Sequence, residues 1–428
     1  MSATSSNPRV LLSTVYRRYS GVYVDFINDN FQHKPWSPCM PRDFNIGLRF
    51  IKRNVPEVEL LEYPNWDEYK AKLAEGWDVV GFSLYQSEIT EVERMIEEAR
   101  RQGVREIWAG NYGALDPHIE SLVDRTVIGP GENAVAGLFG HRVADDQIKH
   151  PLVVGSLSIN HGKIKLLNVA ILYTRHGCPY KCSFCQAAAF GGGHTFNINE
   201  EGIENVLKKL RSMGIKYILL YDETFGIDPV ASDHITLLFA KYGFRWFAMT
   251  RASIVLHNLD TWCERGLIAT CIGVEVVSQQ VLDTVNKKQK VEEIIEFARK
   301  TKEKGRIYRM INYIVGHENM DEADTLRDVR RLGEMGFDVF ALSILTPFPQ
   351  TPMWDQFDST YGIFDRDYRH YNTEHLVWNH PYVTPERMRF LHREAHRILN
   401  RPFKTAGGIL NRLILPRRQS TRLALDMG

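Results

Sequence analysis

The sequence has few cysteines, no long apolar run and almost no net charge, and each of these absences excludes a class of protein. Six cysteines in 428 residues are too few for a disulfide-rich secreted scaffold. No apolar run approaches the roughly 20 residues that a membrane helix needs, and residues 1–9 lack the apolar core of a signal peptide. A formal net charge of +1 favours neither nucleic acid nor an acidic membrane as a partner. We therefore expect a soluble cytoplasmic protein.

Three of the six cysteines lie within eight residues, as Cys178, Cys182 and Cys185 in the spacing C-x3-C-x2-C. The apolar run 169–173 before them predicts a buried strand, so the cysteines belong to the loop that leaves its C-terminal end. Thiolates from one short loop can converge on a single metal centre, and soft sulfur ligands suit iron–sulfur clusters. Three ligands are one fewer than the usual four, which leaves one iron of a cubane cluster open to a small molecule.

Two other interpretations of the cysteine loop are weaker. A structural zinc site needs a fourth Cys or a His at ligand spacing, and His176 and His194 are the nearest candidates. Disulfides need an oxidising compartment, which nothing in the composition indicates. The other cysteines, Cys39, Cys263 and Cys271, are interpreted as free thiols.

The cysteine loop resembles the signature of radical S-adenosylmethionine (radical SAM) enzymes, in which C-x3-C-x-Phe-C follows a strand. The resemblance implies a [4Fe–4S] cluster whose open iron chelates the amino and carboxylate groups of S-adenosylmethionine (SAM). It also implies an external electron donor of the flavodoxin or ferredoxin type, reductive cleavage of SAM, and a 5′-deoxyadenosyl radical that abstracts hydrogen from the substrate. Phe184 matches the aromatic position that packs near the adenine.

Residues 1–140 alternate strand-like and helix-like segments, which predicts a Rossmann-like parallel sheet with helices on both faces. Ligands of such sheets bind beyond the carboxyl ends of the strands, where the turns carry Ser83, Asn111 and Gly131. The expected strands are 10–15, 58–61, 79–84, 106–109 and 125–128, and the expected helices are 44–53 and 89–102.

This half resembles the cobalamin-binding domain that precedes many radical SAM domains, through residues 78–83, 109–112 and 129–132. The resemblance implies that cobalamin is held at the three turns named above. The Asp-x-His-x-x-Gly segment that supplies a cobalt ligand in base-off cobalamin domains does not occur in the chain. His33, in the long first loop at 28–41, lacks that context. Whether cobalamin binds therefore stays open, and the alternative is a cobalamin-type fold kept as a scaffold or substrate cap.

Residues 141–168 are polar and basic, and we interpret them as a linker that includes a pair of strands around residues 152–166. The βα alternation restarts at residue 169 and runs for six units to residue 355. Six units predict a partial TIM barrel with its active face at the strand C-termini, which matches the (β/α)6 core of radical SAM enzymes. The expected strands are 169–173, 217–221, 245–249, 269–276, 307–315 and 339–345, and the expected helices are 200–213, 231–242, 259–265, 279–304 with a break near Lys287, and 323–335.

Carboxylates that follow two of these strands are candidates to bind SAM. Asp222 and Glu223 come after the second strand, where the family holds the SAM amino group with polar residues; a solvated acidic turn is the alternative. Glu275 ends the fourth strand in a Gly-x-Glu that, in the family, lies at the ribose and methionine end of SAM. A carboxylate there can accept hydrogen bonds from ribose hydroxyls or from the ammonium. Ser278 follows it and is included in the expected SAM site.

Three further residues at the barrel mouth are candidates. Arg251 either meets the SAM carboxylate by a bidentate contact or is a surface arginine. Asn312 is a SAM candidate because buried amides need partners. His317 stands where relatives often have Gly-Leu-Pro-Gly-Glu, and it is interpreted as a substrate-side catalytic proton donor or as a solvated loop histidine.

Residues 356–428 are expected to form a mostly helical region, with an aromatic segment at 357–380 and a helix at 385–400. The region either closes the open barrel and shapes the substrate pocket or packs at the surface. The tail from residue 401 has six Lys/Arg and one acidic residue; it either touches an anionic partner or is a solvated end.

The resemblance implies an enzyme, most commonly a cobalamin-assisted transferase that methylates an unactivated carbon of a small metabolite. One SAM methylates cobalamin and a second makes the radical. A cobalamin-independent alternative rearranges or oxidises its substrate, or transfers the 3-amino-3-carboxypropyl group of SAM to sulfur, carbon or arsenic. A catalytically silent metal-binding scaffold is the non-enzymatic alternative, and the carboxylates at the barrel mouth argue against it.

Overall fold

The structure is a computed structural model, and it describes residues 7–16, 24–25, 40–41, 44–159, 163–191, 195–401, 405 and 407–408. Several features named above lie outside these residues, namely His33, Cys39, His194, most of the long first loop and nearly all of the basic tail.

The N-terminal part forms a five-stranded parallel sheet in the order β4-β1-β5-β6-β7. Counted along the chain, this is the 2-1-3-4-5 order of flavodoxin-like folds, in which ligands bind where the order reverses, between the first and third strands. Leu12 of β1 and Gly81 of β5 are paired at that point. The strands are β1 Val10–Thr14, β4 Glu59–Leu61, β5 Val79–Ser83, β6 Glu106–Gly110 and β7 Arg125–Val127, and the helices are α1 Ile46–Asn54, α2 Trp66–Leu73, α3 Ile89–Arg101, α4 Pro117–Leu122 and α5 Glu132–Ala136.

A second, seven-stranded sheet follows in the order β16-β15-β14-β13-β12-β9-β8. Six of its strands are parallel and succeed one another in chain order, which confirms the expected partial barrel. The seventh, β8, pairs antiparallel with β9, so a segment interpreted as linker extends this sheet at one edge. The division of the chain at residues 140, 168 and 355 stays our proposal. The strands are β8 Val154–Ile159, β9 Ile164–Leu172, β12 Tyr217–Leu220, β13 Arg245–Thr250, β14 Leu267–Glu275, β15 Tyr308–Val315 and β16 Val339–Ile344.

The helices of the barrel lie close to their expected positions. The expected break near Lys287 is confirmed, and Gly305 caps the following helix in the left-handed conformation with φ of 63°. The third expected helix begins earlier than predicted, at Ala252 rather than at residue 259. The helices are α7 Glu200–Ser212, α8 Pro229–Lys241, α9 Ala252–Glu264, α10 Gln279–Thr284, α11 Val291–Lys304 and α12 Glu322–Glu334.

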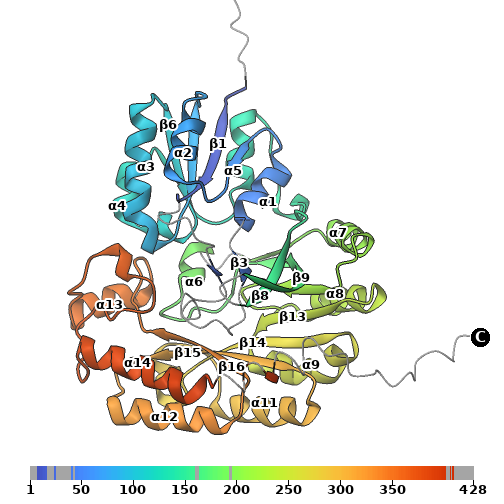
Figure 1. The fold of residues 1–428 in the computed structure, drawn as a ribbon, viewed down its shortest axis with the longest axis vertical. Coiled ribbons are helices and arrows are strands. Elements are labelled where there is room, and N and C mark those ends of the chain that lie inside the picture. Colours follow the sequence, from blue (N-terminus) through green and yellow to red (C-terminus); the bar gives the residue numbers. More distant parts are fainter. Residues whose placement is uncertain are drawn as a thin grey trace, which may run out of the picture.

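The two sheets lie one above the other, and helix α6 (Gln186–Gly191), which follows the cysteine loop, lies between them (Figure 1). This arrangement places the carboxyl ends of the N-terminal strands opposite the barrel. No helix among the described residues is both long and apolar enough to cross a bilayer.

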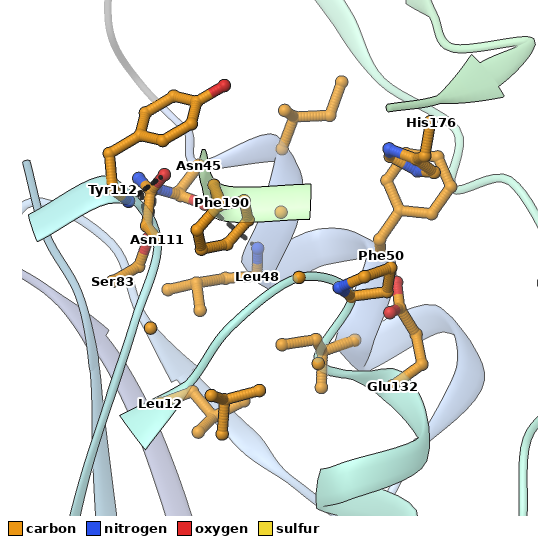
Figure 2. Close-up of a pocket in the computed structure, with 18 of the residues that line it drawn as sticks. Leu12, Asn45, Leu48, Phe50, Ser83, Asn111, Tyr112, Glu132, His176 and Phe190 are labelled. Atoms are coloured by element: carbon orange, nitrogen blue, oxygen red, sulfur yellow. Dashed lines mark hydrogen bonds between the residues drawn. The ribbon is translucent and has the colours of Figure 1, made fainter. Parts of the chain in front are cut away.

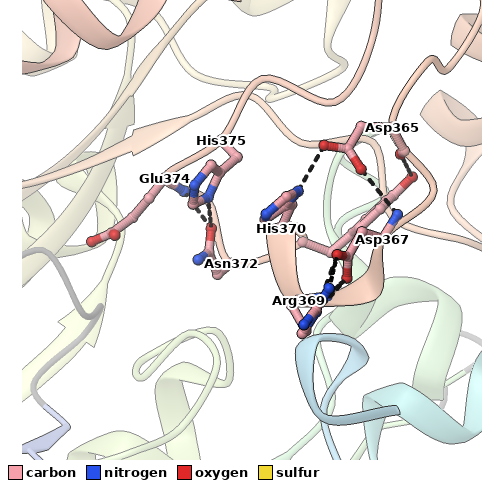
Figure 3. Close-up of polar contacts among 8 residues, drawn as sticks. Asp365, Asp367, Arg369, His370, Asn372, Glu374 and His375 are labelled. Carbon is pink, nitrogen blue, oxygen red and sulfur yellow. Dashed lines mark hydrogen bonds and ion pairs between the residues drawn. The ribbon is translucent and has the colours of Figure 1, made fainter. Parts of the chain in front are cut away.

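The C-terminal region contacts both halves of the protein. Its helix α14 (Pro385–Leu399) packs against α12, and the short helix η6 (Tyr368–His370) lies against the N-terminal domain, where the Tyr368 hydroxyl donates a hydrogen bond of 3.2 Å to Asp116. Figure 3 shows the polar contacts of this segment, including a 2.7 Å contact between Nδ1 of His370 and Asp365. Because it contacts both halves, the region does more than cover the surface of the barrel.

Candidate functional site

The cysteine loop is held in place by two other parts of the chain. Backbone hydrogen bonds join Ser183 N to Val285 O at 3.1 Å and Met353 N to Ser183 O at 3.1 Å, and the Asn286 side chain donates to Lys181 O at 2.8 Å. Segments from α10 and from the start of α13 (Pro352–Thr360) therefore fix the loop on the barrel.

The chemistry of the loop fits a soft metal centre. Burial raises the pKa of Cys185 to about 11 and also raises that of Cys182. Buried thiols of this kind become thiolates when a metal replaces the proton. Within the described part of the chain, no three His, Cys, Asp or Glu side chains form a ready-made metal shell, so the assignment of the three cysteines as cluster ligands stays our proposal.

Asp222 supports the start of the cysteine loop. Its Oδ1 accepts a 2.7 Å hydrogen bond from the Thr174 backbone N–H, and its Oδ2 accepts one from the Thr174 hydroxyl. The side chain is buried, and this burial raises its pKa to about 7. Thr174 therefore already binds both oxygens of the Asp222 carboxylate, which the sequence analysis assigned to SAM.

The neighbouring carboxyl has a different environment. Glu223 lines the cavity between the two sheets, and its Oε2 is buried without a hydrogen-bond partner. Burial raises the pKa of Glu223, while a hydrogen bond from the backbone of Gly177 opposes this rise. The alternative of a solvated acidic turn is wrong for both carboxyls.

Glu275 forms a buried ion pair that the sequence did not predict. Its Oε1 lies 2.6 Å from Nζ of Lys287, and the two side chains are 8% and 10% exposed. Glu275 has a φ of 65°, a strained conformation for a residue with a side chain. A Cβ on Gly273 would lie 2.4 Å from the Glu275 oxygen, so the glycine makes room for the pair.

Arg251 connects the Lys287 segment to the cysteine loop. Its guanidinium donates to the backbone oxygens of Lys287 and Lys288 and lies 3.9 Å from the centre of the Tyr180 ring. It is only 5% exposed, so the surface interpretation is wrong. Phe184 lies close by, with its ring centre 5.8 Å from Nζ of Lys287.

The other barrel candidates lie around this ion pair. Asn312 accepts a hydrogen bond of 3.4 Å from the Cys271 thiol, and Ser278 precedes α10 without capping it through its side chain. His317 is fully buried, and this burial lowers its pKa to about 4, so the ring is neutral at physiological pH. The interpretation of His317 as a solvated loop histidine is therefore wrong.

A cavity of about 320 Å³ separates the N-terminal sheet from the cysteine loop. This volume lies at the lower end of the roughly 300–1,000 Å³ of ligand pockets. It begins at the switch point between β1 and β5 and includes all three residues predicted for cobalamin, Ser83, Asn111 and Gly131. From the barrel side it is lined by Gly177, Glu223 and residues of α6.

Polar and aromatic groups occur together on both sides of the cavity wall. The Ser83 hydroxyl accepts from the amides of Asn45 at 3.2 Å and Asn111 at 3.5 Å. The rings of Tyr112 and Phe190 are 5.1 Å apart and bring the two halves of the protein into contact. Figure 2 shows this group on one side of the cavity, with His176, Phe50 and Glu132 on the other. His176 stacks on Tyr173 and lines the cavity. This position gives no support to the interpretation of His176 as a zinc ligand.

Glu132 makes the stability of the ligand-free protein depend on pH. Burial raises its pKa from 4.5 to about 7, with the charge of Asp145 acting in the same direction. A carboxyl with a raised pKa favours folding at low pH, and this contribution is lost as the pH rises from 4.5 through about 7. The upper bound is on the order of 3 kcal/mol.

A Glu132→Gln variant is therefore expected to be more stable than the wild type at pH 8 and equally stable near pH 5. Chemical denaturation at both pH values measures the difference. A constant difference at the two pH values would contradict the raised pKa.

The fold and the site together define a class of protein. It is a two-domain α/β protein in which a three-cysteine loop at the mouth of a partial barrel faces a cavity at the switch point of a second parallel sheet. Residues 172–329 match the Radical SAM superfamily. The match covers the cysteine loop and most of the barrel, and it bears out the resemblance that this loop indicated.

Curated relatives of the chain include methyltransferases. An uncharacterized methyltransferase of Pyrococcus horikoshii is 24% identical over 237 residues, which cover 53% of this chain and 50% of the relative. The hopanoid C-3 methylase of Methylococcus capsulatus is 26% identical over 275 residues, which cover 62% of this chain and 49% of the methylase. The chain thus spans about half the length of these two relatives.

Among solved structures, the fold is similar to that of the radical SAM methyltransferase TsrM from Kitasatospora setae. The structure of TsrM with tryptophan and a SAM analogue has a TM-score of 0.63 and 15% identity, with 94% of this chain and 96% of TsrM covered. The similarity therefore extends over both domains and the C-terminal region.

Proposed function

We propose that the protein is a radical SAM methyltransferase that uses cobalamin to methylate an unactivated carbon of a small-molecule substrate. The observation that carries the proposal is the cavity between the two domains. It reaches from the switch point of the N-terminal sheet to Gly177, directly before the first cysteine of the loop. A cofactor bound there would lie next to the cluster site.

The relatives support this choice of reaction. The Pyrococcus and Methylococcus relatives are named as methylating enzymes, and TsrM has also been solved with cobalamin and a [4Fe–4S] cluster bound. That TsrM structure has a TM-score of 0.59 and covers 82% of this chain.

The residues of the chain fit both cofactors. Cys178, Cys182 and Cys185 would hold the cluster, and the turns at Ser83, Asn111 and Gly131 would hold cobalamin. A Cβ on Gly131 would lie 2.8 Å from the Cδ1 atom of Ile51, so a larger residue in this turn would displace the end of that side chain in α1. When bound, the cluster supplies the electron that cleaves SAM, and cobalamin carries the methyl group.

The barrel mouth would bind SAM beside the cysteine loop. Phe184, Glu275, Ser278 and Asn312 stay our proposed contacts, and we add Lys287 because its ammonium is buried with Glu275. We assign Asp222 and Arg251 to supporting the loops that carry these groups, because protein backbone already binds their charged atoms.

The chain's other residues would keep water from the reaction. Tyr112, Tyr173 and Phe190 line the cavity with aromatic rings. His317 is neutral and buried at the barrel mouth, and its role as a proton donor stays our proposal. An external donor of the flavodoxin or ferredoxin type would supply the electrons.

Anaerobic reconstitution with iron, sulfide and hydroxocobalamin tests the proposal. We expect about one equivalent of bound cobalamin, together with 5′-deoxyadenosine and S-adenosylhomocysteine when a substrate is turned over. SAM cleavage without cobalamin uptake would instead make the N-terminal domain a scaffold. In that case, 5′-methylthioadenosine would indicate transfer of the 3-amino-3-carboxypropyl group.

A further inference from the structure

One buried carboxyl in the cavity has an oxygen without a hydrogen-bond partner and has no part in the proposed chemistry. Glu132 is the first residue of α5, directly after the glycine turn that follows β7. Only 4% of its surface is exposed, and its Oε2 has no hydrogen-bond partner. A buried carboxyl oxygen without a donor costs about 1–3 kcal/mol. The arrangement therefore indicates that a ligand supplies the donor.

The cavity wall offers no cation that would satisfy this carboxyl. Among the described residues that line the cavity, none is lysine or arginine. The histidine that lines the cavity from the barrel half is His176, whose pKa is lowered to about 4 by burial, so its ring is uncharged. Phe50, Ile51 and Val135 line the same cavity with apolar side chains, and the charge that acts on Glu132 from Asp145 is negative.

Glu132 lies on the side of the cavity opposite the Ser83, Asn45 and Asn111 group (Figure 2). A ligand that satisfies both sides must be wide, and it must carry polar groups at its edge and an apolar face for the rings between. A corrin ring has this pattern, because primary carboxamides surround a flat macrocycle. A small cationic metabolite would reach Glu132 but would not extend to the polar group on the opposite side.

We propose that Glu132 anchors the edge of the corrin ring by pairing with one of its carboxamide side chains. This inference rests on the proposed function. A primary amide carries two N–H donors and one carbonyl acceptor. It donates one N–H to the carboxylate, and when the carboxyl is protonated it also accepts the acid O–H, which closes a two-bond ring. Both protonation states of the carboxyl can therefore bind the amide, whereas an apolar side chain cannot.

Substitutions at residue 132 separate amide pairing from charge attraction. The full-length protein with its reconstituted cluster is titrated with hydroxocobalamin, and the dissociation constant is measured from the absorbance of bound cobalamin. Glu132→Gln keeps an amide-pairing group without charge, and Glu132→Leu keeps the volume without polarity. Glu120→Leu is the matched control, because Glu120 is an exposed residue of α4 in the same domain.

We expect Glu132→Leu to weaken hydroxocobalamin binding by roughly ten- to a hundredfold, the effect of losing one hydrogen bond to a charged group. Glu132→Gln should stay within about threefold of the wild type, and Glu120→Leu should bind as the wild type does. Cluster content should be unchanged in all three variants, which shows that each is folded.

A second probe identifies the chemical group that pairs with Glu132. Heptamethyl cobyrinate carries methyl esters in place of the amides and has no N–H donor. The wild type and Glu132→Leu should bind this probe with equal affinity. An equal loss in the Gln and Leu variants would indicate a cationic ligand and overturn the inference, as would wild-type affinity of Glu132→Leu for hydroxocobalamin. If the wild type itself binds no hydroxocobalamin, the cobalamin part of the proposed function fails with it, and SAM cleavage then reports on the radical SAM half alone.

Discussion

A Cys182→Ala variant, reconstituted anaerobically with iron and sulfide, is expected to hold no [4Fe–4S] cluster and to cleave no SAM. The proposed site has only three protein ligands, so the loss of one leaves two thiolates for four irons. Cys182 is also the buried member of the set, and water would not easily replace its sulfur. Iron and sulfide content and the release of 5′-deoxyadenosine measure the two losses.

Cys263→Ala is the matched control for this experiment. Cys263 is a half-buried free thiol on α9, and burial raises its pKa to about 11, as it does for Cys185. The control should retain full cluster content and SAM cleavage. Full cluster occupancy in a variant that lacks all three loop cysteines would refute the assignment.

A Lys287→Met variant is expected to lose about 3–5 kcal/mol of stability, because it leaves the Glu275 carboxylate buried without a counter-charge. The ion pair is 2.6 Å long and almost fully enclosed, so solvent cannot replace the lost ammonium. Chemical denaturation of the variant measures the loss. We also expect weaker SAM binding, since both partners of the pair lie in the proposed SAM site.

The double variant Glu275→Gln/Lys287→Met should recover much of this loss, because no buried charge remains. Lys304→Met is the matched control: Lys304 pairs with Asp260 at the surface, with exposed fractions of 42% and 76%, and such pairs contribute about 0–1 kcal/mol. A loss below about 1 kcal/mol in Lys287→Met would show that water reaches Glu275.

The order of the elements and the identity of the cysteine loop could both be predicted from the sequence, because both depend on local information. Apolar runs of strand length alternate with helical periodicity, and glycines such as Gly305 end helices in the left-handed conformation. The spacing of three cysteines within eight residues is likewise a property of one short segment. Segments without strong periodicity, such as α2, were not predicted.

Which polar groups meet depends on the tertiary structure and could not be predicted. Asp222 binds Thr174, 48 residues earlier, and Glu275 at the end of β14 pairs with Lys287, which follows α10. In the sequence, Glu132 can be recognised only as the residue that follows a glycine turn. That one of its carboxyl oxygens lacks a hydrogen-bond donor becomes visible when the cavity residues from both domains are in place. These outcomes depend on the register of strands and on the docking of two domains. The period of side chains along a strand reveals which face is buried, but it does not identify the residue on the facing element that supplies or withholds a hydrogen bond.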